Sequence, residues 1–352
     1  MWCAALFLFF VRRMEYIFAK KSQVFRREIE NEIFRIENKE QFEKLSLEIF
    51  HYQAENNSVY KNFIQLQKIN MNEVNSILKI PFLPIDFFKT HSVTNGEFTS
   101  EKIFQSSGTT GQQNSKHFVK DVSLYEKSFT EGFKYFFGNP QDFTFLALLP
   151  SYLERNDSSL VYMMEHLISL SNDKRSGFYL DATTDLVQLI DALNKEKKKH
   201  ILIGVTFALL DFPFEKAQDY SNTIIMETGG MKGRKKEMIR EEVHVELKNK
   251  FRVKTIYSEY GMTELLSQAY SKGNGSFLNP PWMKVLIREA NDPSEILSVT
   301  QSGALNIIDL ANINSCSFIA TDDLGRINAD GSFSISGRMD NSDLRGCNLL
   351  IV

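Results

Sequence analysis

The chain has 352 residues, of which 43% are hydrophobic and 24% charged, and this balance excludes a disordered or collagen-like protein. Its 41 basic and 44 acidic side chains leave a net charge of −3, so there is no reason to expect a nucleic acid as a partner. The three cysteines, Cys3, Cys316 and Cys347, are too few for a disulfide framework and fit a reducing, cytoplasmic compartment.

The chain begins with a short apolar run, residues 2–11, followed by Arg12 and Arg13. A membrane span needs about 20 apolar residues, and a secretory signal carries its positive charge before the apolar run. We therefore expect no stable membrane span. Met14 offers a second start, which favours an interpretation of residues 1–13 as an upstream extension from a mis-assigned start. The alternative is a leader that touches a membrane surface.

Residues 14–99 are predicted to form a helical N-terminal region. Phe42, Leu45 and Ile49 recur at helical spacing, and charged residues fill the positions between them. The two prolines Pro81 and Pro84 end this pattern. Because proline disfavours helix in the residue before it, residues 80–89 are predicted to be extended.

Short apolar runs alternate with amphipathic stretches across residues 100–282. The runs cover residues 143–149, 200–205, 223–226 and 255–257, and the amphipathic stretches cover residues 123–137, 158–170 and 185–193. This alternation predicts an α/β core on a substantially parallel sheet. Residues 283–352 are predicted to form a β-rich subdomain, with runs at residues 284–288, 304–309, 317–321 and 332–336.

Three segments carry residues suited to bind a nucleotide. Residues 104–116 alternate small hydroxyl residues with glycines and end at Lys116, a composition that lets backbone N–H groups surround a phosphate. The spacing is not that of a Walker A loop, and a flexible surface loop is the alternative.

The second segment is Ser258–Glu264, with the sequence Ser-Glu-Tyr-Gly-Met-Thr-Glu after a predicted strand. Its ring, glycine and carboxylate suit base stacking, close approach and Mg²⁺ binding, and the alternative is an ordinary strand-to-helix turn. The third comprises residues 321–325 and 337–340, where an acidic pair could hold ribose hydroxyls. There the alternative is a hairpin.

In this order the segments resemble the adenylate-forming superfamily, which includes acyl-CoA synthetases and nonribosomal adenylation domains. The resemblance covers roughly residues 100–345, and its most specific element is Tyr260–Glu264. Within the superfamily the chain is most similar to acyl-protein synthetases of the LuxE type, which serve the fatty acid reductase of bacterial bioluminescence. The supporting segments are residues 81–89, 228–234, 258–264 and 345–347.

The resemblance implies an α/β fold, namely the large N-terminal domain of these enzymes, with mixed sheets flanked by helices and a β-rich C-terminal portion. It also implies ATP and Mg²⁺ as cofactors. The implied nucleotide-binding residues are Ser106, Ser107, Gly108, Thr109, Thr110 and Gly111 for the phosphates, Gly229, Gly230, Tyr260 and Gly261 for adenine, Thr263 for phosphate, and Asp323 and Arg338 for ribose. Glu264 would bind Mg²⁺, and Lys116 ends the phosphate loop as a catalytic candidate.

The chain stops shortly after Asp340, where the larger superfamily places the hinge to a small C-terminal lid domain, so we expect no lid and no lid lysine. Lys232, Arg234, Lys235 and Lys236 are candidates for the missing cation, because they precede an amphipathic stretch with Ile239, Val243, Leu247 and Phe251 at helical spacing. An anion bound there would relieve the conflict between these charges and the helix dipole. The alternative is a solvated basic turn.

Cys347 is the predicted acyl acceptor, since the resemblance places an acylated cysteine near the C-terminus. A thiolate is a good nucleophile toward an acyl adenylate, and Arg345 nearby would lower the pKa of the thiol. The alternative is that Cys347 simply begins an apolar terminal strand. Cys316 has no such context and is predicted to lie in the core.

These observations predict a cytoplasmic acid–thiol ligase. It would activate a carboxylic acid, by resemblance a fatty acid, as acyl-AMP and pass the acyl group to Cys347 or to a partner, either an acyl-accepting protein or a reductase. One alternative is an ATP-independent acyltransferase, because residues 117–121 have His-x-x-x-Asp spacing from His117 to Asp121 and a histidine base could activate an acceptor hydroxyl. The other is a subunit that binds a nucleotide without turnover.

Overall fold

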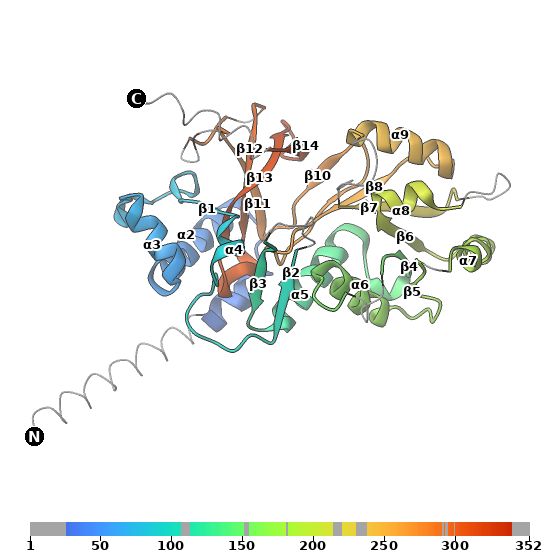
Figure 1. Ribbon diagram of the computed structural model, residues 1–352, viewed down its shortest axis with the longest axis horizontal. Coiled ribbons are helices and arrows are strands. Elements are labelled where there is room, and N and C mark those ends of the chain that lie inside the picture. Colours follow the sequence, from blue (N-terminus) through green and yellow to red (C-terminus); the bar gives the residue numbers. More distant parts are fainter. Residues whose placement is uncertain are drawn as a thin grey trace, which may run out of the picture.

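The parallel strands predicted between residues 100 and 282 are present and adjacent. The computed structural model describes residues 26–106, 113–150, 155–180, 182–213, 220–229, 238–290, 292, 295–298 and 300–339. The strands β4 (Thr144–Leu148), β6 (His200–Val205), β7 (Thr223–Thr228) and β8 (Tyr257–Tyr260) pair in parallel, and the short β5 (Gly177–Phe178) joins the β4 edge. They lie at the opposite end of the molecule from α2 (Lys39–Asn56) and α3 (Ser58–Leu66) (Figure 1).

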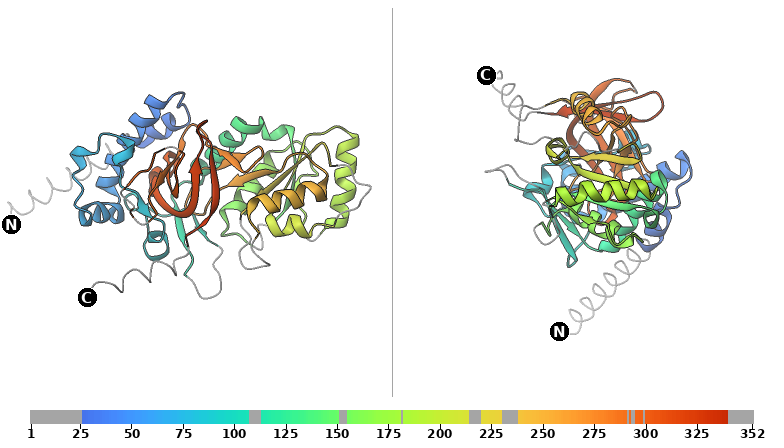
Figure 2. Two further views of the ribbon diagram at one scale, coloured as in Figure 1. Left: turned by 90° about the horizontal axis from the view of Figure 1, so that it is seen from above. Right: turned by 90° about the vertical axis from the view of Figure 1, so that its right-hand side faces the viewer.

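Successive residues of these strands enter two different hydrophobic clusters. Phe145 and Ala147 of β4 belong to the cluster of α5 (Val122–Phe137) and α6 (Ser159–Leu170). Leu146 and Leu148 belong to the cluster of α7 (Thr183–Lys195), α8 (Thr206–Asp211) and α9 (Arg240–Phe251). Because helices cover both faces of the sheet (Figure 2), its strands must be apolar on both sides, which is why they appear as continuous apolar runs.

The same sheet continues without interruption into the β-rich part. Its strand order is β11-β12-β13-β14-β10-β9-β8-β7-β6-β4-β5. The added strands are β9 (Ala269–Ser271), β10 (Ser276–Leu278), β11 (Met283–Arg288), β12 (Ser302–Asp309), β13 (Phe318–Ile327) and β14 (Phe333–Arg338). Each pairs with its neighbour in the antiparallel direction, including β9 with β8. The boundaries expected at residues 99 and 282 stay predictions.

The described residues of the N-terminal region include several helices. Residues 26–33 are helical, and α2 and α3 precede the 3₁₀ turns η1 (Met71–Glu73) and η2 (Ile77–Lys79). The predicted apolar face of α2 is buried. Gln53 and Asn57 donate hydrogen bonds to backbone carbonyls of η4 (Leu310–Asn314) and of Ser315, which follows it, so these helices dock on the turn between β12 and β13.

Three sequence predictions need correction. Residues 80–89 are not all extended, since α4 (Phe87–Thr90) follows β1 (Leu83–Pro84): the effect of Pro84 reaches only the residue before it. The strand predicted at residues 255–257 is β8, which ends at Tyr260, because β7 and β9 pair with it on both sides. Ile239 is 59% exposed and precedes α9, whose buried face begins at Val243.

The sequence also did not reveal a separate hairpin. Strands β2 (Lys102–Gln105) and β3 (Lys116–Val119) form an antiparallel sheet of their own and border the segment predicted to bind phosphate. The remaining 3₁₀ turn is η3 (Pro140–Asp142). Cys316 lies in the core, as predicted, and burial raises the pKa of its thiol to about 12. Among the described helices, none combines the length and the apolar character that crossing a bilayer requires.

Candidate functional site

Three of the residues expected to contact the nucleoside lie together. Asp323 on β13 is directly opposite Arg338 on β14, and its Oδ1 accepts a hydrogen bond of 2.9 Å from the Arg338 Nε. Its Oδ2 accepts a hydrogen bond of 2.7 Å from the hydroxyl of Tyr260 at the end of β8. The Asp323 side chain is 9% exposed, and each of its carboxylate oxygens has a second lone pair for another donor.

Tyr260 is largely a core residue. It is 8% exposed, and its ring makes edge-on contacts with Phe277 and Phe333 at centroid distances of 5.9 and 5.7 Å. Burial and the neighbouring Asp323 carboxylate hold the pKa of Tyr260 well above its usual value, so the hydroxyl remains a neutral donor. The contact between this ring and adenine stays a prediction.

The loop that follows β8 is fixed through its backbone by buried side chains. The His117 Nδ1 on β3 lies 2.8 Å from the carbonyl oxygen of Thr263. The amide of Asn312 in η4 donates a hydrogen bond of 2.8 Å to the carbonyl oxygen of Glu264. The backbone at Thr263 and Glu264 is thus held by two different elements, β3 and η4.

Asp309, the last residue of β12, fixes the next part of this loop. Its carboxylate accepts hydrogen bonds of 2.8 and 2.9 Å from the backbone N–H groups of Leu266 and Ser267, and one of 2.5 Å from the Ser267 hydroxyl. Burial raises the pKa of Asp309 to about 6, although these hydrogen bonds act to lower it. Such a pre-formed loop holds its side chains in place before any ligand arrives.

Glu264 is the residue that the family resemblance assigns to Mg²⁺. Glu264 is 5% exposed. Within the described ranges, no group of three or more His, Cys, Asp or Glu side chains could hold a metal ion. Mg²⁺ is usually bound by one or two carboxylates together with substrate phosphates and waters. A single glutamate on a fixed loop fits that pattern.

The segment expected to bind phosphate starts and ends on the β2–β3 hairpin. Ser106 and Ser115 close it through two hydrogen bonds, from the Ser115 N–H to the Ser106 hydroxyl at 2.9 Å and from the Ser106 N–H to the Ser115 carbonyl at 3.1 Å. Lys116, the first residue of β3, is exposed. Ser107, Gly108, Thr109, Thr110 and Gly111 lie outside the described residues.

A buried charged cluster, missed by the sequence analysis, supports the end of β7. The Glu227 carboxylate accepts a hydrogen bond of 2.7 Å from Arg240 and lies 3.4 Å from the His244 Nε2. Although burial acts to raise it, His244 and Arg240 hold the pKa of Glu227 below its usual value. Gly229, two residues later, has a φ of +73°, and its carbonyl accepts a hydrogen bond from Thr206.

A second buried acid lies on the opposite face of the sheet. Glu259 is paired across β7 and β8 with Thr228, whose hydroxyl donates to its carboxylate. A Cβ on residue 261 would lie 2.6 Å from the Glu259 Oε1, so a larger residue in place of Gly261 would require this carboxylate to shift. Burial raises the pKa of Glu259 to about 7, and Glu227 adds to this effect while Thr228 opposes it.

Glu259→Gln is expected to remove a pH-dependent loss of stability. An acid whose pKa is raised by folding binds a proton more tightly when folded, so its contribution to stability falls as the pH rises from 4.5 to 7. The free energy of unfolding of the variant, relative to that of the wild type, should therefore rise by roughly 3 kcal/mol between pH 4 and pH 8. Urea unfolding of both proteins at the two pH values measures this, and an unchanged difference would contradict the assigned ionisation.

Several predicted residues lie outside the described part of the chain. These are Gly230, the four cation candidates Lys232, Arg234, Lys235 and Lys236, and the acyl-acceptor candidate Cys347. His117 and Asp121, paired in the acyltransferase alternative, have separate tasks: His117 contacts Thr263, whereas Asp121 caps α5 through the Ser123 N–H at 2.9 Å.

The supporting residues missed by the sequence analysis had one local signal. Glu227 and Asp309 are acids at the ends of otherwise apolar strands, a position where a carboxylate must be satisfied by partners. Their partners are distant in the chain, so the sequence alone did not identify them. Asn312 carries no comparable signal.

The comparisons with known proteins agree with the family resemblance of the sequence motifs. The family profile described as "Acyl-protein synthetase, LuxE" matches residues 28–352. No curated protein matches. Among solved structures, 2-hydroxyisobutyryl-CoA ligase in an open conformation with 2-HIB-AMP and CoA has 12% sequence identity and a TM-score of 0.61, covering 86% of this chain and 70% of that chain.

The same ligase in its thioesterification state gives 13% identity and a TM-score of 0.61, covering 87% of this chain and 70% of that chain. ATP-bound MatB from Rhodopseudomonas palustris gives 15% identity and a TM-score of 0.49, covering 67% of this chain and 47% of that chain. The chain therefore spans about half the length of the MatB structure. The similarity to the 2-hydroxyisobutyryl-CoA ligase shows a shared fold.

Proposed function

This chain belongs to the acyl-protein synthetase, LuxE, family, and from that we propose that it activates a carboxylic acid with ATP. The products of this step are an acyl adenylate and pyrophosphate. The observation that carries the proposal is the grouping of Tyr260, Asp323 and Arg338 through two hydrogen bonds on one carboxylate. These three residues come from separate strands and match the motif positions that the family resemblance assigns to the nucleoside.

In the first step, a carboxylate oxygen of the acid attacks the α-phosphorus of ATP, and the bond to the β-phosphate oxygen breaks. Asp323 accepts hydrogen bonds from the ribose hydroxyls, while Thr263 and Lys116 contact the phosphates. Glu264 would hold Mg²⁺ together with the phosphates of the nucleotide, and the ion would supply positive charge for the departing pyrophosphate. Since no proton transfer is required, positioning and charge stabilisation supply most of the rate enhancement.

In the second step, the acyl group moves to a thiol. The thiolate of Cys347 attacks the carbonyl carbon of the acyl adenylate, AMP leaves with the oxygen that came from the acid, and a thioester forms. A protein partner would then receive the acyl group or reduce it. The class of acid, by family resemblance a fatty acid, belongs to the proposal as well.

The ATP-independent alternative fits the contacts less well. His117 is 1% exposed and its Nδ1 is occupied by a backbone carbonyl, whereas Asp121 caps a helix. A base that activates an acceptor must be within hydrogen-bond reach of it. The contacts therefore favour the ATP-dependent reaction.

Acid-dependent exchange between ATP and pyrophosphate tests the proposal. The protein is incubated with Mg²⁺, ATP, labelled pyrophosphate and a panel of straight-chain and aromatic acids. Exchange that depends on one class of acid supports adenylation and identifies that class. Tight ATP binding without exchange would favour a non-catalytic nucleotide-binding subunit, and the absence of ATP binding would reject the assignment of the nucleotide site.

Asp323→Asn is expected to raise the KM for ATP about tenfold, because a charged acceptor of hydrogen bonds is worth roughly 1.5–3 kcal/mol. Asp322→Asn is the matched control. Successive side chains of a strand point to opposite faces, so the Asp322 side chain points away from Tyr260. Its substitution should change the KM for ATP less than about twofold. Exchange kinetics with varied ATP compare the two variants. Equal effects would contradict a specific ribose contact.

A further inference from the structure

The β2–β3 hairpin stands apart from the large sheet, although it carries two of the expected phosphate-binding residues. Ser106 follows β2, and Lys116 begins β3. Thr263 and Glu264 lie on the loop after β8, which belongs to the large sheet. If all four residues bind one ATP molecule, the hairpin and the loop must keep a fixed relation to each other.

His117 links these two elements directly. Its Nδ1 lies 2.8 Å from the Thr263 carbonyl oxygen, and a carbonyl can only accept a hydrogen bond, so Nδ1 carries the proton. Burial lowers the pKa of His117 to about 4, which keeps the imidazole neutral near pH 7. The ring also makes an edge-on contact with Phe88 of α4 at 5.9 Å.

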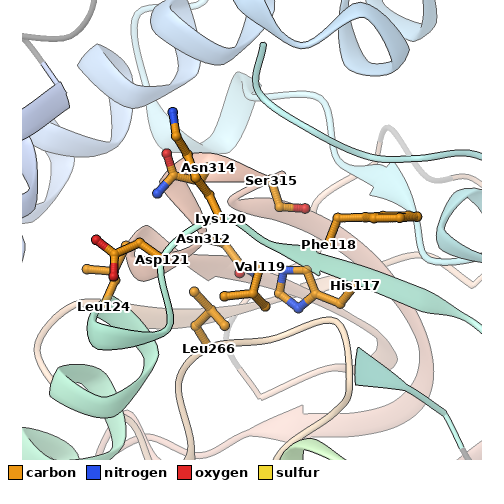
Figure 3. A pocket seen from close by; sticks show the side chains of 10 residues that line it. All are labelled: His117, Phe118, Val119, Lys120, Asp121, Leu124, Leu266, Asn312, Asn314 and Ser315. Carbon is orange, nitrogen blue, oxygen red and sulfur yellow. The ribbon is translucent and has the colours of Figure 1, made fainter. Parts of the chain in front are cut away.

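His117 lines a small pocket with Leu266 of the loop and Asn312 of η4 (Figure 3). The pocket has room for only about one water molecule, so ATP does not bind there. His117 therefore acts on the loop backbone rather than on a ligand.

A buried polar group costs free energy unless it is hydrogen-bonded, and an apolar side chain at position 117 would avoid that cost. The presence of an imidazole there therefore indicates that its hydrogen bond to the loop has a role. Side chains alternate along β3, and Lys116 is exposed where His117 is buried. Fixing the His117 ring therefore also fixes the direction in which Lys116 leaves the strand.

We propose that His117 is a positioning residue that couples Ser106 and Lys116 on the hairpin to Thr263 and Glu264 on the loop. This inference rests on the proposed function, because it assigns both groups of residues to one ATP molecule. Its effect is on the binding of ATP and not on the binding of the acid.

The test compares three variants of the full chain. His117→Leu removes the donor, and His117→Gln moves it toward the position of Nε2, whereas His117→Asn retains a donor close to the position of Nδ1. We expect His117→Leu and His117→Gln to raise the KM for ATP in the exchange reaction about tenfold, with the KM for the acid unchanged. His117→Asn should stay within about threefold of the wild type.

Three outcomes would overturn the inference: wild-type ATP kinetics in His117→Leu, an equal defect in His117→Asn and His117→Leu, or parallel increases in both KM values. Exchange by the wild type tests the proposed function separately. If the wild type binds ATP without exchange, the Kd for ATP from calorimetry replaces the KM in the same comparison, and an absence of ATP binding overturns the inference as well.

A second measurement needs no variant. The ¹⁵N shifts of the wild-type His117 ring should show the tautomer with the proton on Nδ1. A proton on Nε2 would reject the hydrogen bond to Thr263 and the coupling with it, even if the leucine variant does not fold.

Discussion

Glu264→Gln is expected to slow acid-dependent exchange of pyrophosphate into ATP at least about a hundredfold, the loss typical when one charge-stabilising group is removed from an active site. Glu264 is buried on a loop fixed by His117, Asn312 and Asp309. The amide keeps the size of the side chain but lacks the charge that attracts Mg²⁺. The rate at increasing Mg²⁺ concentration measures the effect, and excess Mg²⁺ should restore part of the activity.

Glu131→Gln provides the matched control. Glu131 pairs with Lys134 on the partly exposed surface of α5, and its substitution should leave the rate and its Mg²⁺ dependence unchanged. A Glu264→Gln variant with the Mg²⁺ dependence of the wild type would contradict the role of this carboxylate. The substitution leaves the backbone contact between residue 264 and Asn312 in place. The melting temperature of the variant shows whether any loss of activity comes from a general loss of structure.

Cys347→Ser is expected to abolish the acyl-enzyme while exchange continues at the wild-type rate. The two steps use different groups, since exchange requires only the formation and reversal of the acyl adenylate. A hydroxyl is a far weaker nucleophile than a thiolate at neutral pH, so no thioester can form. Incubation with radiolabelled acid and ATP, followed by acid precipitation, measures the label that stays on the protein.

Cys316→Ala is the control for this experiment. The Cys316 thiol is fully buried, and burial raises its pKa to about 12, so it is neither accessible nor ionised. This variant should keep the label. Labelling that persists in Cys347→Ser, or that disappears in Cys316→Ala, would assign the acyl group to a different residue.

The sequence was most informative where local pattern and tertiary structure agree. The runs that became β4, β6 and β7 are mostly apolar, because helices cover both faces of that part of the sheet. The motifs named Tyr260, Asp323 and Arg338 as separate nucleoside-binding candidates. The structure brings them together through hydrogen bonds, and their roles toward a nucleotide stay predictions.

The sequence was least informative where long-range contacts decide the outcome. The Ser258–Tyr260 segment is polar enough for a loop, yet pairing with β7 and β9 makes it a strand. Asp309 contacts a loop more than 40 residues earlier in the chain, as the separation of 43 positions from Leu266 shows. The strands of the β2–β3 hairpin have four residues each, too short for a clear period of two.

Transfer of oxygen from the acid to AMP tests the central claim most directly. When the substrate acid carries ¹⁸O in its carboxyl group, attack on the α-phosphorus places one of these oxygens in the acyl adenylate, and AMP keeps it when the acyl group leaves. Mass spectrometry should therefore find AMP with one ¹⁸O atom and unlabelled pyrophosphate. Unlabelled AMP, or ADP with labelled phosphate, would show that no acyl adenylate forms.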